Sequence, residues 1–402
     1  MKSYVTSVFI LLSALVCRAT DIIKNDDFNY DVTIEAEHKI RLIDKNSEAL
    51  QARLDLIREA KSSIKIEVFY FNPDQSGKII LAALLEKKKQ NPGIEIQLHL
   101  DSWGSEDFTD SYISLLQRNN IEVRKYNGSR IFGFGPERKN HRKTWLIDGS
   151  LALIGGFNVA DEHLGFSMTY NMIDRDILIK GPVLKYMLEA YTKLWNQSAS
   201  FVASSKPDPD LKIQPWFSDQ KSVMPEWVSV PKIRFLTNIR REGEPEAWLK
   251  NQLDLILSSA KKQIVIEAKY FMPSVSTLWI LNERLSAKIA LDILTNREAS
   301  EHPIDELMVF FGRFLLSYLK LNGAMIHYLS DTSLGTAQGL NSESQKARWG
   351  THAKTIVVDD RVIIGSYNMD FLSGYLNIEQ FVVIDSEDLA QKTLHSIRAR
   401  EL

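Results

Sequence analysis

Two hydrophobic periods alternate along this chain. Residues 47–61 carry apolar side chains at helical spacing, as in Leu50, Leu54 and Ile57. Residues 64–71 follow as a short apolar run rich in β-branched and aromatic side chains, which is typical of a buried strand. The same criteria predict helices over 78–89 and 109–119 and strands over 94–101 and 121–126. This alternation predicts an α/β protein with helices on the faces of a sheet.

The pattern occurs twice, at an offset near 200 residues. The tetrapeptide LDLI stands at 54–57 and again at 253–256, and KIR stands at 39–41 and 232–234. Within the predicted strand 64–71, Glu67 recurs as Glu267 at the equivalent position of the second copy. A helix over 246–262 and a strand over 264–271 are the expected counterparts of the first pair. The chain is therefore predicted to be two copies of one domain.

The composition of the segment between the two copies predicts the domain boundaries. Five prolines and two tryptophans, Trp216 and Trp227, lie among polar residues between the copies, which predicts a linker packed on the surface. We therefore expect an N-terminal domain over 35–203, a linker over 204–231 and a C-terminal domain over 232–402.

The first residues have the organisation of a secretory signal peptide. Lys2 precedes an uncharged run that ends at Cys17, and small residues follow near Ala19. The run is shorter than the roughly 20 residues that span a bilayer. We expect residues 1–19 to be removed and the protein to be exported, to the periplasm or the medium; a buried N-terminal helix, an uncleaved anchor and a lipoprotein signal are the alternatives. No later run is long enough to span a membrane.

Overall composition excludes several kinds of site. Cys17 is the single cysteine, so an intramolecular disulfide, a cysteine-based zinc site and a CxxC redox pair are excluded. The chain has 49 Lys and Arg against 51 Asp and Glu, a formal net charge of -2. That balance disfavours binding of nucleic acid through a global positive field.

One motif that carries chemistry occurs once in each copy. The spacing HxKxxxxD is found at residues 141–148 and at 352–359. Each motif is followed by a glycine, a small residue and an asparagine, at 155–158 and at 365–368. Two such matches at equivalent places in a duplicated domain exclude coincidence.

Strand geometry brings the motif residues together. Residues i and i+2 of a strand share a face, so the His141 imidazole and the Lys143 ammonium point to one site. A hairpin turn after the first strand returns Asn158 beside them. The second copy provides the same set: His352, Lys354 and Asn368. Two copies that face each other across a pseudo-twofold axis supply two of each group.

A phosphodiester fits such a site. The two lysines neutralise its non-bridging oxygens, and Asn158 and Asn368 donate hydrogen bonds as charge develops. One histidine attacks phosphorus while the other protonates the leaving oxygen. Because the lysines and amides can stabilise the negative charge of the phosphate, no metal or cofactor is expected. Asp148 and Asp359 complete the motif and stand with the catalytic candidates, although we expect a turn-supporting or ion-paired role.

The two motifs resemble those of the phospholipase D superfamily, over about residues 39 to 400. The resemblance implies two α/β domains, each a mixed β-sheet flanked by helices, that form a pseudo-twofold bilobal monomer with one shared active site. It also implies a phosphohistidine intermediate, with His141 as nucleophile and His352 as general acid. The family orients its histidines with carboxylates, whose counterparts here are Glu379 and Asp174, with Asp176 as the second choice for the latter.

Softer features resemble the cardiolipin synthase branch of that superfamily. They are the glycine pair at 155–156, the residues up to Gly165, and the segment 101–105. One feature distinguishes the copies: five residues separate Asp359 from Gly365, one fewer than in the first copy. A shorter second turn can change where Asn368 points.

A lipid is the favoured substrate. The charge balance, the export signal and an aromatic, glycine-rich loop at 131–136 all favour it, although the loop can equally be an ordinary packed loop. A basic cluster around His141, including Arg130, Arg138 and Arg142, suits a lipid phosphate or a DNA strand. We therefore expect a metal-independent phosphodiesterase that cleaves the headgroup side of phospholipids, with transfer to an alcohol as cardiolipin synthases do. An exported nuclease and an inactive module that binds phospholipid or protein are the alternatives.

The expected partner is a phospholipid or membrane surface, with nucleic acid the weaker expectation. No oligomer is required, because both half-sites lie in one chain.

Overall fold

The computed structural model describes residues 29–127, 138–200, 206–212, 224–239, 247–298, 303–329, 338, 340 and 342–400. The predicted signal peptide, the aromatic loop 131–136, Arg130 and Trp216 lie outside these residues. Within them, every helix is too short or too polar to cross a membrane.

The first copy, here called the first repeat, alternates strands and helices as expected. Its strands are β1 (Asn29–Ile43), β2 (Ser63–Val68), β3 (Glu95–Asp101), β4 (Glu122–Tyr126), β5 (Thr144–Ile147), β6 (Leu151–Gly155), β7 (Tyr170–Ile173), β8 (Asp176–Lys180) and β9 (Ala199–Ser200). Its helices are α2 (Asn46–Glu59), α3 (Gln75–Gln90), α4 (Asp110–Arg118), α5 (Asp161–Leu164) and α6 (Leu184–Gln197).

The second repeat follows the same order. Its strands are β10 (Val228–Asn238), β11 (Gln263–Ala268), β12 (Ala290–Thr295), β13 (Met325–Tyr328), β14 (Arg348–Thr351), β15 (Lys354–Val358), β16 (Arg361–Gly365) and β17 (Gln380–Asp385). Its helices are α7 (Trp248–Ser258), α8 (Val275–Ser286), α9 (Pro303–Leu321), α11 (Phe371–Tyr375) and α12 (Glu387–Arg398), with a short 3-10 turn at Ser344–Lys346.

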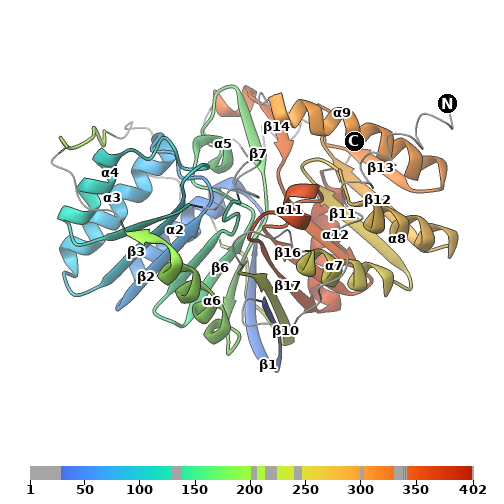
Figure 1. The fold of residues 1–402 in the computed structure, drawn as a ribbon, viewed down its shortest axis with the longest axis horizontal. Coiled ribbons are helices and arrows are strands. Elements are labelled where there is room, and N and C mark those ends of the chain that lie inside the picture. Colours follow the sequence, from blue (N-terminus) through green and yellow to red (C-terminus); the bar gives the residue numbers. More distant parts are fainter. Residues whose placement is uncertain are drawn as a thin grey trace.

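The two repeats share one continuous mixed sheet (Figure 1). Strands β1 and β10 pair antiparallel at its centre. Outward from this pair the order is β8, β6, β5, β2, β3, β4 on one side and β17, β16, β15, β11, β12, β13 on the other. Each of these strands therefore has a counterpart across a pseudo-twofold axis between β1 and β10, and the short β9 extends the sheet beyond β4 in the first repeat alone among the described residues. The predicted fold of two tandem α/β copies is confirmed.

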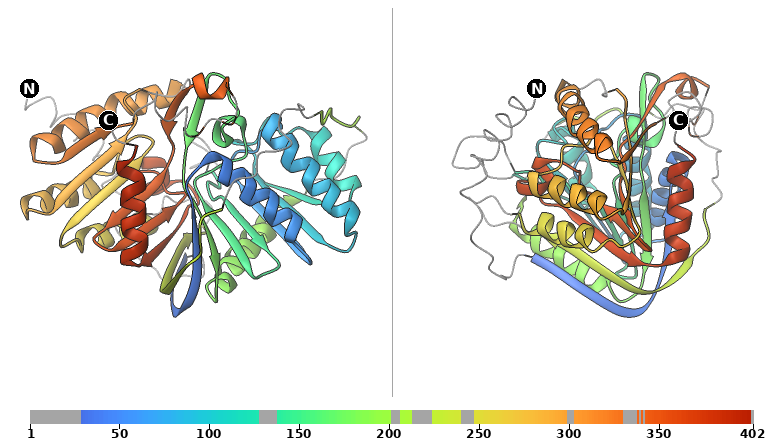
Figure 2. Two further views of the ribbon diagram at one scale, coloured as in Figure 1. Left: turned by 180° about the vertical axis from the view of Figure 1, so that it is seen from behind. Right: turned by 90° about the vertical axis from the view of Figure 1, so that its right-hand side faces the viewer.

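Helices cover the sheet in three buried clusters. One packs α2, α3 and α4 on the first repeat, and another packs α7, α8 and α9 on the second. The third lies at the centre, where α6 and α12 cover strands of both repeats, as the two views in Figure 2 show. Burying one large aliphatic side chain contributes about 1.5–3 kcal/mol, so the central cluster fixes one repeat against the other.

The junction between the repeats is more ordered than its composition indicates. Strand β10 begins at Val228, inside the predicted linker. Trp227, just before it, lies under the guanidinium of Arg41 at 4.5 Å and the ammonium of Lys180 at 4.6 Å from its ring centre. Strand β1 likewise begins at Asn29, because its first residues pair with β10. The described end of the linker therefore packs against the first repeat.

Candidate active site

Each motif leads into a hairpin: the histidine precedes the first strand, which begins at Thr144 in one repeat and at Lys354 in the other. The two hairpins have the same register. In the first, Thr144 pairs with Ile154, and in the second, Thr355 pairs with Ile364. Three residues connect Ile147 to its partner Leu151, whereas two connect the equivalent strands of the second repeat. The missing residue therefore lies wholly within the turn. Because the register is conserved, Asn158 and Asn368 each follow the paired isoleucine by four residues.

Two short parallel strand contacts connect the repeats next to the motif histidines. Strand β14, which precedes His352, pairs with β7 of the first repeat, and the His352 N–H donates to the Ile173 carbonyl at 2.7 Å. On the other side Asn140 bridges to Ile378, and the His141 N–H donates to the Ile378 carbonyl at 2.9 Å. Each histidine therefore lies next to the segment that leads into the carboxylate of the opposite repeat.

His141 is oriented by Glu379. Its Nδ1 lies 3.0 Å from Glu379 Oε1 and 3.1 Å from the Ser366 carbonyl oxygen. Both partners accept hydrogen bonds, so Nδ1 carries the proton and Nε2 keeps its lone pair. Burial lowers the pKa of His141 to about 4, against the opposing charge of Glu379. The geometry therefore presents a neutral imidazole with a nucleophilic Nε2.

Glu379 is ionised by its surroundings. The Ser366 hydroxyl donates to Oε2 at 2.5 Å, the Ser373 hydroxyl to Oε1 at 2.7 Å, and the Asn377 amide to Oε1 at 3.2 Å. Burial acts to raise its pKa, but the charges and donors around it, His141 and Lys143 included, outweigh burial and lower it. A carboxylate with this many donors holds its charge and its position.

His352 is paired with Asp174 of the first repeat. Its Nδ1 lies 2.5 Å from Asp174 Oδ2 and 2.7 Å from Lys354 Nζ. Burial raises the pKa of Asp174 to about 7, against the nearby charge of Lys354. Burial also lowers the pKa of His352 well below its usual value. The proton retained near neutral pH therefore lies on Asp174, whereas Glu379 is ionised.

The residue after the first hairpin glycine explains one difference between the motifs. A Cβ on Gly156 would lie 2.1 Å from Asp174 Oδ1, so only glycine fits beside this carboxylate. Its counterpart Ser366 instead donates its hydroxyl to Glu379. The glycine in the first repeat and the serine in the second each match the carboxylate that they contact.

Both motif lysines are buried beside their histidines. Lys143 Nζ donates to the His141 carbonyl at 2.7 Å, and Lys354 Nζ donates to that of His352. Burial lowers the pKa of Lys143 to about 7 and that of Lys354 to about 8. An anionic phosphate between them would favour their charged forms. The two buried lysines, one from each repeat, therefore favour the binding of an anionic group between the repeats.

The sequence matches, over residues 54–195 and 253–399, the family model described as cardiolipin synthase, PLD-like domain. The chain belongs to this phospholipase D-like family. A cardiolipin synthase of Listeria welshimeri is 26% identical over 373 residues, covering 90% of this chain and 69% of that protein. One from Clostridium perfringens is 26% identical over 385 residues, covering 92% of this chain and 72% of that protein.

A solved structure of the same fold is the phosphatidylserine synthase of Haemophilus influenzae. It superimposes with a TM-score of 0.66 at 16% identity, covering 90% of this chain and 87% of that one. The similarity extends across both repeats, so the shared architecture is that of the whole two-repeat unit.

A third histidine stands in this phospholipase D-like site, and the sequence did not single it out. The rings of His163 and His352 meet edge to face with centres 4.6 Å apart. Asn158 Nδ2 lies 3.1 Å from His163 Nε2, so the motif asparagine holds this histidine in the first repeat. Its position five residues after Asn158 is the one indication that the sequence offers. Asn368 is buried, and its backbone N–H donates to the Ser373 hydroxyl at 3.1 Å.

The two half-sites also differ in the residue that directly follows β2 in the first repeat and β11 in the second. Phe69 contacts His141 with ring centres 4.8 Å apart, and the Lys143 ammonium lies 5.1 Å from its ring centre. The equivalent residue is Lys269, whose ammonium pairs with Asp305 at 2.6 Å. The charge of Lys269 contributes to lowering the pKa values of both His352 and Lys354.

The motif aspartates lie at the hairpin turns. Asp148 accepts hydrogen bonds from the backbone N–H groups of Lys61, Ser62 and Ser63, and Asp359 from those of residues 261–263. Asp148 lies five positions after Lys143 along extended chain, about 16 Å away. The structure does not bring either aspartate to the histidines; both join the turn to the neighbouring strand. Asp176, the second choice as orienting carboxylate, pairs instead with Arg53 at 2.9 Å.

Two buried ion pairs support the histidine strands. Glu67 accepts from Arg142 at 2.7 Å, and Glu267 accepts from Arg175 at 2.7 Å. Arg142 stands between the motif histidine and lysine, and Arg175 follows Asp174. The sequence did contain a signal for these ion pairs, because each repeat has a glutamate near the end of a predicted buried strand. These pairs fix the backbone that carries the site residues.

Among the described residues, His163, Asp174 and His352 are the group whose donor atoms could hold a metal ion, all within 4.8 Å of one another. Two of the three are the hydrogen-bonded pair described above. Metal independence therefore stays a prediction for experiment.

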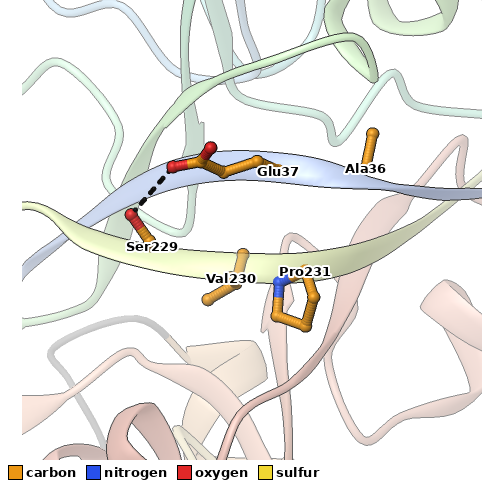
Figure 3. Close-up of a pocket in the computed structure, with 5 residues that line it drawn as sticks. All are labelled: Ala36, Glu37, Ser229, Val230 and Pro231. Atoms are coloured by element: carbon orange, nitrogen blue, oxygen red, sulfur yellow. Dashed lines mark hydrogen bonds between the residues drawn. The ribbon is translucent and has the colours of Figure 1, made fainter.

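A surface pocket lies elsewhere, on the central strands β1 and β10 (Figure 3). It is lined by Ala36, Glu37, Ser229, Val230 and Pro231, and the Ser229 hydroxyl donates to Glu37 at 3.3 Å. This lining lacks a histidine and a cation. The motif residues, not this pocket, define the candidate active site.

Proposed function

We propose that the protein is a phosphatidyltransferase of the phospholipase D type, which acts on phospholipid phosphodiesters through a phosphohistidine intermediate. The observation that carries the proposal is the pair of buried His–Lys sets, each completed by a carboxylate from the opposite repeat. Relatives named cardiolipin synthase support a phospholipid substrate.

In the first step His141 Nε2 attacks phosphorus. A nitrogen–phosphorus bond forms, and the bond from phosphorus to the headgroup oxygen breaks. With protonated Asp174 hydrogen-bonded to its Nδ1, neutral His352 carries a proton on Nε2 and gives it to the departing oxygen, so the headgroup leaves as a neutral alcohol. The Asp174 proton moves to Nδ1 and keeps the imidazole neutral. Lys143 and Lys354 stabilise the non-bridging oxygens as their charge increases.

In the second step an alcohol takes the place of the first headgroup. His352 accepts its proton, the alcohol oxygen attacks phosphorus, and the bond to His141 breaks. Water in the same position gives hydrolysis instead. Transfer and hydrolysis therefore share their first step and differ in the acceptor.

The carboxylate partners support this division of roles. Glu379 stays ionised and holds a neutral His141 with Nε2 free, as a nucleophile requires. Asp174 has a pKa raised to about 7 by burial, so the pair with His352 holds a proton near neutrality. A general acid needs that proton.

The test compares vesicles with DNA. We expect the protein to release glycerol, ethanolamine or choline headgroups from phospholipid vesicles in EDTA. His141→Ala and His352→Ala should each reduce turnover by about 10⁴-fold or more, with unchanged circular dichroism. Phosphohistidine should be trapped in His352→Ala and not in His141→Ala.

Headgroup release that survives either substitution would overturn the mechanism. Degradation of plasmid DNA in EDTA, with vesicles left intact, would identify a nuclease. Chromatography of the lipid products with added glycerol or phosphatidylglycerol separates transfer from hydrolysis.

A further inference from the structure

Helix α9 of the second repeat has an uncovered apolar face. Its residues Val309, Leu316 and Leu319 are buried against the sheet. Six other large apolar side chains of the helix are between 42% and 89% exposed: Leu307, Phe310, Phe311, Phe314, Tyr318 and Leu321. Their spacing places them on one side, about 100° of the helix circumference. We call these six residues the apolar stripe.

The stripe is a feature of one repeat only. Its counterpart α4 spans nine residues, against nineteen in α9, and exposes none of its large apolar side chains. Within the stripe, Phe310 packs edge to face on Phe311 and Phe314, with ring centres 5.4 and 5.3 Å apart. The extra helical turns therefore carry an aromatic surface that the fold itself does not bury.

The stripe lies on the helix that borders the active site. Asp305 in the first turn of α9 pairs with Lys269, whose charge acts on His352 and Lys354. In mid-helix, a Cβ on Gly312 would lie 2.9 Å from the Phe271 carbonyl oxygen, so α9 packs closely on the segment just after Lys269. Figures 1 and 2 show α9 at the outer edge of the molecule, on the side of β7 and β14.

Exposed cations lie beside the stripe, together with one exposed carboxylate, Glu306. Arg313 and Lys320 are exposed on the adjoining side of α9, and the Arg313 guanidinium donates to the carbonyl of exposed Arg297 at 2.6 Å. In the described part of the chain no carboxylate pairs with Arg297, Arg313 or Lys320. Aromatic and leucine side chains flanked by basic residues are the composition of helices that lie in the interface of anionic membranes.

We propose that the apolar stripe of α9 inserts into the interface of a bilayer containing anionic phospholipid, with Arg297, Arg313 and Lys320 at its headgroups. This surface rests on the proposed function, because it would hold the active site at the layer where phospholipid phosphates lie. It makes the second repeat the membrane-facing half of the enzyme.

The test measures binding separately from turnover. Full-length protein carrying Phe310→Ser and Phe314→Ser is compared with the native chain in flotation with vesicles of equal parts phosphatidylglycerol and phosphatidylcholine. Leu255→Ser is the matched control, because Leu255 is 63% exposed on α7, outside the stripe. We expect the double variant to bind at least tenfold more weakly and the control to bind normally. Arg313→Gln with Lys320→Gln should abolish the preference for phosphatidylglycerol over pure phosphatidylcholine.

A second readout locates the insertion. An environment-sensitive fluorophore at Phe314→Cys, in a Cys17→Ser background, should shift to the blue on adding vesicles, and one at Leu255→Cys should not. Hydrolysis of bis(p-nitrophenyl) phosphate, a water-soluble phosphodiester, should be unchanged in the Phe310→Ser/Phe314→Ser protein.

Several results would overturn the proposal. Equal vesicle binding by the native chain and the double variant would do so, and so would a native dimer that the double variant converts to monomers in sedimentation velocity, since a second copy would then cover the stripe. Vesicle binding is also measured with the inactive His352→Ala variant, so that binding is observed in the absence of turnover. Normal binding without turnover in the native chain would refute the proposed function and leave the membrane surface intact.

Discussion

His141 and His352 occupy equivalent positions in the two repeats, yet their surroundings differ in three respects. His141 meets an ionised Glu379 and the aromatic ring of Phe69. His352 meets Asp174, whose pKa is raised by burial, and lies close to His163 and to the charge of Lys269. Duplication supplies two copies of each catalytic group, and different neighbours give the two orienting carboxylates different protonation states. One shared site can therefore contain both a nucleophile and an acid.

The largest expected effect distinguishes the two carboxylates. Glu379→Gln removes an ionised group and leaves three donors facing an amide, so we expect kcat to fall by about 10³–10⁴-fold. Asp174→Asn removes a group that is already partly neutral near pH 7, so a loss of about 10²-fold is expected. Steady-state rates of both variants at pH 6 and pH 7 provide the comparison. A greater loss of kcat in Asp174→Asn than in Glu379→Gln at both pH values would reverse the assigned roles.

A smaller effect tests the charge of Lys269. A nearby cation disfavours the protonated forms of His352 and Lys354, so Lys269→Gln should raise both pKa values. Lys354, with its pKa of about 8, loses its proton on the alkaline limb of the pH–rate profile, after Lys143 and Asp174 with their pKa values of about 7. The upper part of that limb should therefore move to higher pH by several tenths of a unit. Glutamine retains a donor for Asp305.

Phe69→Leu, the matched change in the first repeat, should leave the limbs of the profile where they are and lower the rate only modestly. Movement of the alkaline limb to lower pH in Lys269→Gln would show that the lysine acts by another route.

The smallest effect concerns a feature that the repeats share. Asp148→Ala and Asp359→Ala each remove the acceptor of three backbone N–H groups, so each should cost about 1–2 kcal/mol of unfolding free energy while kcat stays unchanged. Their donors hold both pKa values below the usual range, although burial acts to raise them. That stability is therefore present above the unfolded-state pKa and is lost as the pH falls through the folded one.

Urea unfolding at pH 7 and pH 3 measures this loss. The asparagine variants serve as controls, because asparagine tolerates the left-handed backbone found here, with φ of 54° and 55°. A large loss of kcat in a stable, folded alanine variant would return these aspartates to the catalytic set.

Much of the fold was predictable because it is written in local patterns. Apolar spacing located α2, α3 and β3 within a few residues, and the repeated segments predicted two copies related by a pseudo-twofold axis. The spacing of His141 and Lys143 predicted that they share a face. Each of these features depends on residues that are near each other in the chain.

The partners of the histidines were not predictable in the same way. Asp174 and Glu379 could be selected as carboxylates, but their assignment to the histidine of the opposite repeat depends on the β7–β14 pairing and on the Asn140–Ile378 bridge. These contacts are too short to leave a periodic pattern, and they join segments far apart in sequence. His163 and Lys269 were missed for the same reason.

The sequence by itself determined that this protein has two copies of one α/β unit and two His–Lys pairs, because hydrophobic period and i, i+2 spacing are local properties of the chain. Tertiary structure alone decided which carboxylate serves which histidine and which of the two apolar sides of α9 is left uncovered. Both outcomes depend on long-range packing, in which the surroundings of a side chain come from segments that its own neighbours in sequence do not specify.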